Sequence, residues 1–234
     1  TIDVPSHWAL RGDGRWGAPA YTNVDFPFPV DPPFPPEENP VGDYSRRFTC
    51  PESWLTSGGQ IRLRFEGVES QIVVWVNGQW IGMARGSRLA HEFDITQELV
   101  PGENTVTLRV HQFSAGSYLE DQDQWWLPGV FRSVSLRYLP DFSIEDLWID
   151  TDYEAGEGFA TLELRVRGEQ SETLEANLEI EGLGTSVLTL ARGEDGRYRS
   201  ERIGLGNVQP WSAQSPKLYA ARVQVCLLYT SDAA

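Results

Sequence analysis

Hydrophobic and polar positions alternate with a period of two over much of the chain from residue 44 onward. In QIRLRF (60–65) every second side chain is apolar, which is typical of a strand with one buried face. QIVVWV (71–76) is nearly all apolar and predicts a central strand buried on both faces. Asn77-Gly78 comes next and favours a hairpin turn, because both residues tolerate positive φ. No segment has a convincing helical period, so we expect an all-β fold.

The spacing of the strands predicts two β-sandwiches. Further strands are expected at 105–110 and 132–139, and a new series of short strands begins after Pro140. Gly-rich turns separate the strands of this second series, which is typical of an immunoglobulin-like sandwich of about 90 residues. The last nine residues, CLLYTSDAA (226–234), continue neither pattern, and we expect them to be a non-native tail.

Residues 1–43 are rich in proline and glycine and predict an extended surface segment. A flexible linker is the alternative, but four apolar side chains within the segment favour packing onto a surface: Phe26, Phe28, Val30 and Phe34. The first residue is Thr1, not methionine. We therefore expect the chain to begin inside a longer protein.

The net charge of −15 limits the kinds of partner that we expect for this protein. A strongly acidic surface repels phosphate backbones and anionic lipids, so we expect no nucleic-acid partner and no membrane partner. Cys50 and Cys226 lie far apart without metal-ligand spacing, which does not support a zinc site. Two lone cysteines favour a reducing compartment, so we expect a cytoplasmic location. The 34 acidic residues do not by themselves select a catalytic carboxylate pair.

The stretch YLEDQDQWWLPGVFRSV (118–134) combines acidic and aromatic side chains. Glu120, Asp121 and Asp123 lie next to Trp125 and Trp126. Carboxylates suit hard cations and sugar hydroxyls, and indole rings pack against the apolar faces of sugars. A surface loop beside ordinary core tryptophans has the same composition, so the local chemistry leaves both interpretations open.

Longer stretches add a resemblance. PAYTNVDFPFPVDPPFPPEENPVGDYSRRFTCPESW, VWVNGQWIGMARGSRLAHEFDIT and GSYLEDQDQWWLPGVFRSVSL resemble the sugar-binding jelly-roll domain of large bacterial β-galactosidases of glycoside hydrolase family 2. PWSAQSPKLYAARV (210–223) is similar to the end of the family's second domain. The resemblance covers nearly all of residues 3–225 in the right order.

This resemblance implies a jelly-roll β-sandwich over 1–139, lacking its first strand, and an immunoglobulin-like β-sandwich over 140–225. In the family these domains precede a (β/α)₈ barrel that carries two catalytic glutamates of a retaining mechanism. We therefore expect the chain to be the non-catalytic part of an enzyme that hydrolyses terminal β-D-galactosides such as lactose, and to be inactive alone. The missing strand should leave an unpaired edge or an exposed apolar patch. The alternative is a free-standing carbohydrate-binding module.

The resemblance also implies two site residues. Asn23 matches an asparagine that reaches into the galactose site, and Asp123 matches an aspartate that contacts galactose hydroxyls and ligates sodium. The other sodium ligands, and the ligands of the parent enzyme's magnesium, would come from the missing barrel. The implied partners are a galactoside, the remaining domains and further copies in a homo-oligomer. A turn-capping role for Asn23 and a plain loop position for Asp123 remain the structural alternatives.

The neighbouring side chains of the 118–134 stretch have expected structural roles. We expect Glu120 and Asp121 to bond loop N–H groups or to pair with Arg132. Trp125 is expected to support the edge of the core, and not to serve as a sugar platform.

Overall fold

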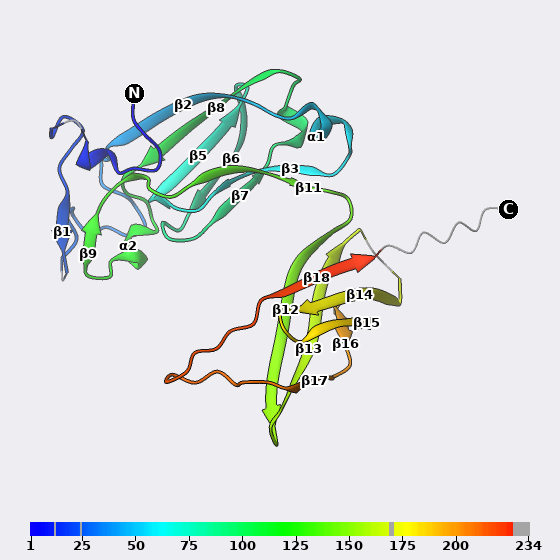
Figure 1. Ribbon diagram of the computed structural model, residues 1–234. Coiled ribbons are helices and arrows are strands. Elements are labelled where there is room, and N and C mark those ends of the chain that lie inside the picture. Colours follow the sequence, from blue (N-terminus) through cyan, green and yellow to red (C-terminus); the bar gives the residue numbers. More distant parts are fainter. Residues whose placement is uncertain (12, 24, 169–170, 227–234) are drawn as a thin grey trace. The chain divides into compact units, whose positions relative to one another are not determined.

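The computed structural model describes residues 1–11, 13–23, 25–168 and 171–226, which form the strands and short helices of Figure 1. The contacts divide the chain into two compact units, one ending at Pro140 and the other beginning at Asp141. The helices are short: α1 (Glu52–Thr56), α2 (Ser117–Glu120) and the 3₁₀ turns η1 (Trp8–Leu10) and η2 (Thr96–Glu98). Within the described ranges, no helix has the length and apolar character to cross a membrane. The all-β expectation is confirmed.

The first unit contains two larger antiparallel sheets, whose strands are labelled in Figure 1. The four-stranded sheet has the order β2 (Val41–Thr49), β8 (Glu103–His111), β5 (Gln71–Val76) and β6 (Gln79–Arg85). The three-stranded sheet has the order β11 (Val134–Leu139), β3 (Gln60–Phe65) and β7 (His91–Asp94). Two small ladders join β1 (Ala20–Thr22) to β9 (Gln124–Trp126), and β4 (Val68–Glu69) to β10 (Gly129–Val130).

The core of the first unit follows from the alternation in β3 and β5. Every second side chain of each strand is buried, namely Ile61, Leu63 and Phe65 in β3, and Ile72, Val74 and Val76 in β5. The two sheets share this core and therefore face each other as a sandwich. Burial of each such side chain contributes about 1.5–3 kcal/mol. The intervening residues of β5 are only half-buried, so the expectation that β5 is buried on both faces is wrong for its second face.

The turn between β5 and β6 has the predicted form, with Asn77 and Gly78 both at positive φ. A two-residue turn with positive φ matches the twist of the strands that it joins. The hairpin prediction is therefore confirmed.

Most of residues 1–43 are exposed or half-buried, as expected of a surface segment, but Trp8 and Ala9 pack into the core. Trp8 is 6% exposed and belongs to the same core as β3 and β5. The backbone N–H of Ser6 donates to the carbonyl of Val130, with an N···O distance of 2.8 Å. A Cβ at Gly42 would lie 2.6 Å from the Trp8 ring, so the glycine allows this close approach. The proline-rich sequence around Trp8 shows no period that would predict burial of its indole ring, although burial stabilises so large a side chain.

The proline-rich arm docks through only part of its apolar side chains. Phe28 is buried with Phe113 and Trp126 in a small aromatic cluster, against which Phe26 also packs. The expected packing of Val30 and Phe34 is wrong, because both side chains are exposed. The backbone of Phe34 has a contact instead: the Tyr118 hydroxyl donates to the Phe34 carbonyl at 2.7 Å.

The second unit is built from one hydrogen-bonded series of strands around its own core. The series runs β12 (Ser143–Glu154), β13 (Glu157–Arg167), β16 (Tyr198–Ser200), β15 (Gly184–Arg192), β14 (Thr173–Ile180) and β18 (Ala221–Cys226), and β17 (Ile203–Asn207) also pairs with β13. Apolar residues of β13, β14 and β15 alternate into this core together with Tyr198. Residues 227–234 of the expected tail lie outside the described residues.

Candidate functional site

The β1–β9 ladder brings the two predicted site residues to the same place. Its antiparallel register pairs Tyr21 with Trp125 and Thr22 with Gln124. Asn23 directly follows β1 and Asp123 directly precedes β9, so both residues stand at the same end of the ladder. Both are exposed, and they are about 100 positions apart in sequence. Two segments that are distant in sequence therefore place hydrogen-bond acceptors, on Asn23 and Asp123, at one exposed end of the ladder. This end is called the rim below.

The two faces of this ladder differ in burial. Trp126 is 5% exposed, packs in the aromatic cluster and donates through Nε1 to the Thr22 hydroxyl at 2.7 Å. Trp125 is 54% exposed and Tyr21 is 50% exposed, with ring centroids 5.6 Å apart. Successive strand residues point to opposite faces, which separates the two tryptophans. The core-support role expected for Trp125 is wrong, and Trp126 fills that role.

The two carboxylate oxygens of Asp123 differ in their hydrogen bonding. The Tyr21 hydroxyl donates to Asp123 Oδ1. This hydrogen bond raises the pKa of Tyr21, so the phenol stays protonated as a donor. Among the described residues, no hydrogen bond or ion pair reaches Oδ2. The backbone of Asp123 has φ of +54°, a conformation that aspartate tolerates better than most residues.

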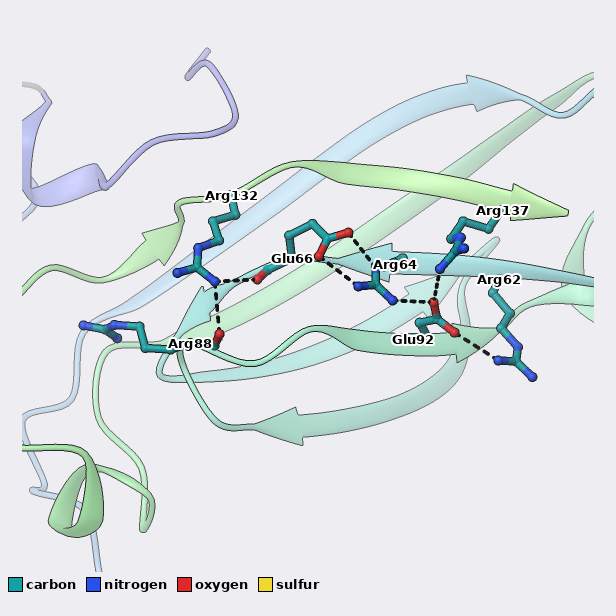
Figure 2. Close-up of polar contacts among 7 residues, drawn as sticks. All are labelled: Arg62, Arg64, Glu66, Arg88, Glu92, Arg132 and Arg137. Atoms are coloured by element: carbon teal, nitrogen blue, oxygen red, sulfur yellow. Dashed lines mark hydrogen bonds and ion pairs between the residues drawn. The ribbon is translucent and has the colours of Figure 1, made fainter. Parts of the chain in front are cut away.

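Glu120 bonds to a neighbouring loop, and Asp121 is partly buried. Glu120 accepts hydrogen bonds from the backbone N–H of Ser87 at 2.8 Å and from its hydroxyl at 2.6 Å, which confirms the expected bond to a loop N–H. The alternative partner, Arg132, donates instead to the backbone carbonyls of Glu66 and Arg88 (Figure 2). The Oδ1 atom of Asp121 is buried without a hydrogen-bond partner.

Glu69 supports the segment after β9 and was not singled out from the sequence. It is 4% exposed, and its Oε1 accepts the Leu127 N–H at 3.3 Å. Arg88 Nη1 lies 3.0 Å from Oε2. Burial raises the pKa of Glu69 to about 7, although the Arg88 charge opposes the shift. The sequence EGVES could have indicated this role, because Glu69 stands there among Gly, Val and Ser. A carboxylate in a strand of apolar and small residues needs a partner when it is buried.

A separate network of ion pairs covers the three-stranded sheet. Glu92 accepts hydrogen bonds from Arg64 at 2.8 Å, and from Arg62 and Arg137 at 3.0 Å each (Figure 2). Burial opposes ionisation of Glu92, but these hydrogen bonds outweigh it and lower its pKa to about 2. The three arginines come from two adjacent strands, so the network ties β3 and β11 to β7.

The acceptors at the end of the β1–β9 ladder suit sugar hydroxyls or one side of a hard cation. Within the part of the chain that the structure describes, no group of three or more His, Cys, Asp or Glu residues could hold a metal ion. Asp123 therefore belongs to no such group among the described residues.

Two family models match the chain. Residues 1–140 match "Glycosyl hydrolases family 2, sugar binding domain", and residues 142–229 match "Glycosyl hydrolases family 2". The β-galactosidase of Arthrobacter sp. (strain B7) is 48% identical over 224 residues, which are 95% of this chain and 21% of that protein. The β-galactosidase of Leuconostoc mesenteroides is 39% identical over 96% of this chain and 23% of that protein. The chain thus spans about a fifth of the length of these curated relatives.

Solved structures share the fold. A β-glycosidase from Bacteroides vulgatus superposes with a TM-score of 0.67 at 19% identity, over 97% of this chain and 28% of that one. A β-glucuronidase from Bifidobacterium dentium gives 0.66 at 20% identity, over 82% of this chain and 38% of that one. The two β-sandwiches, the family matches and the curated relatives agree: the chain belongs to glycosyl hydrolases family 2 and carries the family's sugar-binding domain followed by a second family domain.

Proposed function

We propose that this chain forms the rim of the substrate site of a retaining β-galactosidase whose catalytic glutamates lie outside the chain. The observation that carries the proposal is the β1–β9 register, which sets Asn23 and Asp123 at one exposed end of a ladder. Support also comes from the relatives named β-galactosidase, the first of which is 48% identical. The substrate class is a terminal β-D-galactoside such as lactose.

The rim residues would bind and orient the sugar. The Asn23 amide and the Asp123 carboxylate can hydrogen-bond galactose hydroxyls, and a fixed ring position lowers the entropic cost of reaching the transition state. The open Oδ2 of Asp123 also fits one ligand position of sodium, a hard cation that prefers oxygen. Bound sodium would supply a fixed positive charge beside the sugar. The remaining sodium ligands, and those of magnesium, would belong to the domains that complete the enzyme.

Asp123→Asn in the full-length enzyme that carries this chain tests the proposal. We expect kcat/KM for a chromogenic β-galactoside to fall about 100-fold, because a mispositioned sugar loses transition-state alignment. Sodium dependence of the rate should largely disappear, since the amide removes the anionic ligand.

Asp13→Asn is the matched control. Asp13 is also exposed and also has positive φ, at +51°, so the control reproduces the backbone demand without the site. Its kinetics should stay within about twofold of the unchanged enzyme, as expected for an isolated surface substitution. Unchanged activity and sodium dependence in Asp123→Asn would contradict the proposal.

A free-standing carbohydrate-binding module is the second candidate. The exposed ring pair of Tyr21 and Trp125 beside Asn23 and Asp123 favours it, because aromatic faces next to hydroxyl acceptors suit sugars. The two candidates differ in whether this chain binds sugar without further domains.

A further inference from the structure

Tyr21 and Asp123 contact each other diagonally across the ladder. The direct partner of Tyr21 is Trp125, yet its hydroxyl reaches Asp123, two positions before Trp125. Diagonal neighbours in an antiparallel pair lie on the same face and within reach of a long side chain. Tyr21, Trp125 and Asp123 therefore form one exposed group on the face opposite Trp126.

The Tyr21–Asp123 hydrogen bond is not what holds the ladder together. On the opposite face, Trp126 is buried and donates to Thr22, and the aromatic cluster packs beneath it. These contacts remove apolar area from water, whereas a hydrogen bond between exposed groups adds little to stability, because water competes for both partners. The phenol must have its main effect on the orientation of the carboxylate.

A carboxylate has two equivalent oxygens and turns readily about the bond to Cβ. The phenol ties Oδ1 at one point, and this leaves Oδ2 in a defined direction. The Trp125 ring, tilted by 46° at 5.6 Å, limits the movement of the phenol ring in turn. Trp125 thus supports Tyr21, and Tyr21 supports Asp123. Contacts of this kind, made by residues that do not touch the metal, orient the side chains that bind it.

We propose that Tyr21 is a positioning residue that fixes the Asp123 carboxylate, so that Oδ2 is presented to a bound sodium ion and the adjoining sugar hydroxyl. The inference rests on the proposed function and deepens it, because it assigns a residue that governs cation affinity through Asp123.

Tyr21→Phe is the decisive variant, because it keeps the ring against Trp125 and removes only the donor. Rates of the full-length enzyme with a chromogenic β-galactoside are measured over a range of NaCl, with choline chloride holding the ionic strength constant. We expect the sodium concentration for half-maximal rate to rise about 10-fold, the usual scale for loss of a support behind a metal ligand. The thermal midpoint should not change.

Tyr138→Phe is the matched control. Its hydroxyl donates to the Gly58 carbonyl at 2.8 Å and its ring stacks on Trp54, both away from the β1–β9 ladder. Loss of this phenol should leave the half-maximal sodium concentration unchanged.

Asp123→Asn distinguishes failure of the proposed function from failure of the role assigned to Tyr21. If Asp123→Asn leaves sodium dependence intact, the proposed function fails. If Asp123→Asn abolishes that dependence while Tyr21→Phe behaves like Tyr138→Phe, only the role of Tyr21 is overturned. A Tyr21→Phe enzyme that is slower at every sodium concentration, with an unchanged half-maximal concentration, would show a purely structural role and would also overturn it.

Discussion

At the scale of single residues, two glutamates of the first unit show how environment sets acidity. Glu69 and Glu92 both lie in short strands, β4 and β7 respectively. Burial raises the pKa of Glu69 to about 7, whereas hydrogen bonds from three arginines lower that of Glu92 to about 2 against the effect of burial. The two carboxyl groups must therefore affect stability in opposite directions as pH changes.

Glu69→Gln should change the pH dependence of stability. The folded-state pKa of Glu69 is above its usual value of 4.5, so its contribution is complete below about pH 4.5 and is lost as pH rises through 7. That loss approaches roughly 3 kcal/mol by pH 8, and the neutral amide should abolish it. Urea unfolding at pH 5 and pH 8 measures the difference between the variant and the unchanged chain.

Glu92→Gln is the opposing control for this measurement. The contribution of Glu92 is present above pH 4.5 and is lost as pH falls through about 2, so its removal should cost more at pH 7 than at pH 3. Equal pH profiles for the unchanged chain and Glu69→Gln would show that Glu69 has an ordinary pKa.

At the scale of elements, the long strands were predictable and the short ones were not. β3 and β5 carry enough residues to display the period of two, and the Asn77-Gly78 turn carries its own signal. The three-residue strands β1 and β9 and the four-residue helix α2 are too short to display any period. Burial of Trp8 depends on backbone contacts with residues 128–130, which no local pattern indicates.

Phe28→Ala should show how firmly the proline-rich arm is docked. The Phe28 ring lies 4.6 Å from that of Phe113, and the side chain is nearly buried. We expect a loss of about 3 kcal/mol in the free energy of unfolding, because the truncation leaves a cavity in the aromatic cluster. Urea titration followed by fluorescence measures this loss.

Phe34→Ala serves as the control within the same arm. Phe34 is 65% exposed, and the backbone carbonyl that Tyr118 contacts is retained in the variant. Its effect should stay within about 0.5 kcal/mol. Similar losses for both variants would contradict the docking that the cluster implies.

At the scale of the whole molecule, the described residues form two large hydrophobic cores, a small aromatic cluster and the exposed ladder end that carries Asn23 and Asp123. The family resemblance identified Asn23 and Asp123 as site residues. Their adjacency could not be predicted, because it depends on the register between segments about 100 residues apart. Tyr21 was missed, although its spacing of two from Asn23, and that of Asp123 from Trp125, was visible in the sequence. The fold class followed from patterning, and the site required tertiary pairing.

This chain on its own should not hydrolyse a chromogenic β-galactoside. A retaining mechanism needs two carboxyl groups about 5 Å apart across the scissile bond, and the proposed rim supplies binding groups instead. Calorimetry with galactose and lactose should give no measurable heat at millimolar sugar, because much of the proposed site is contributed by other domains. The Arthrobacter relative, assayed in parallel, provides the positive control.

Turnover by the pure chain would contradict the proposed function. Tight binding without turnover would favour the carbohydrate-binding module instead.

The ladder between β1 and β9 also has a consequence for synthesis on the ribosome. Tyr21 emerges 102 residues before Asp123, a gap of roughly 5–20 s at ordinary elongation rates. During that interval the arm has no partner strand. Seven prolines between residues 27 and 40 lack the N–H groups that a stray strand would pair with. The same composition that makes the arm extended thus leaves fewer N–H groups for premature strand pairing until its partner strand is made.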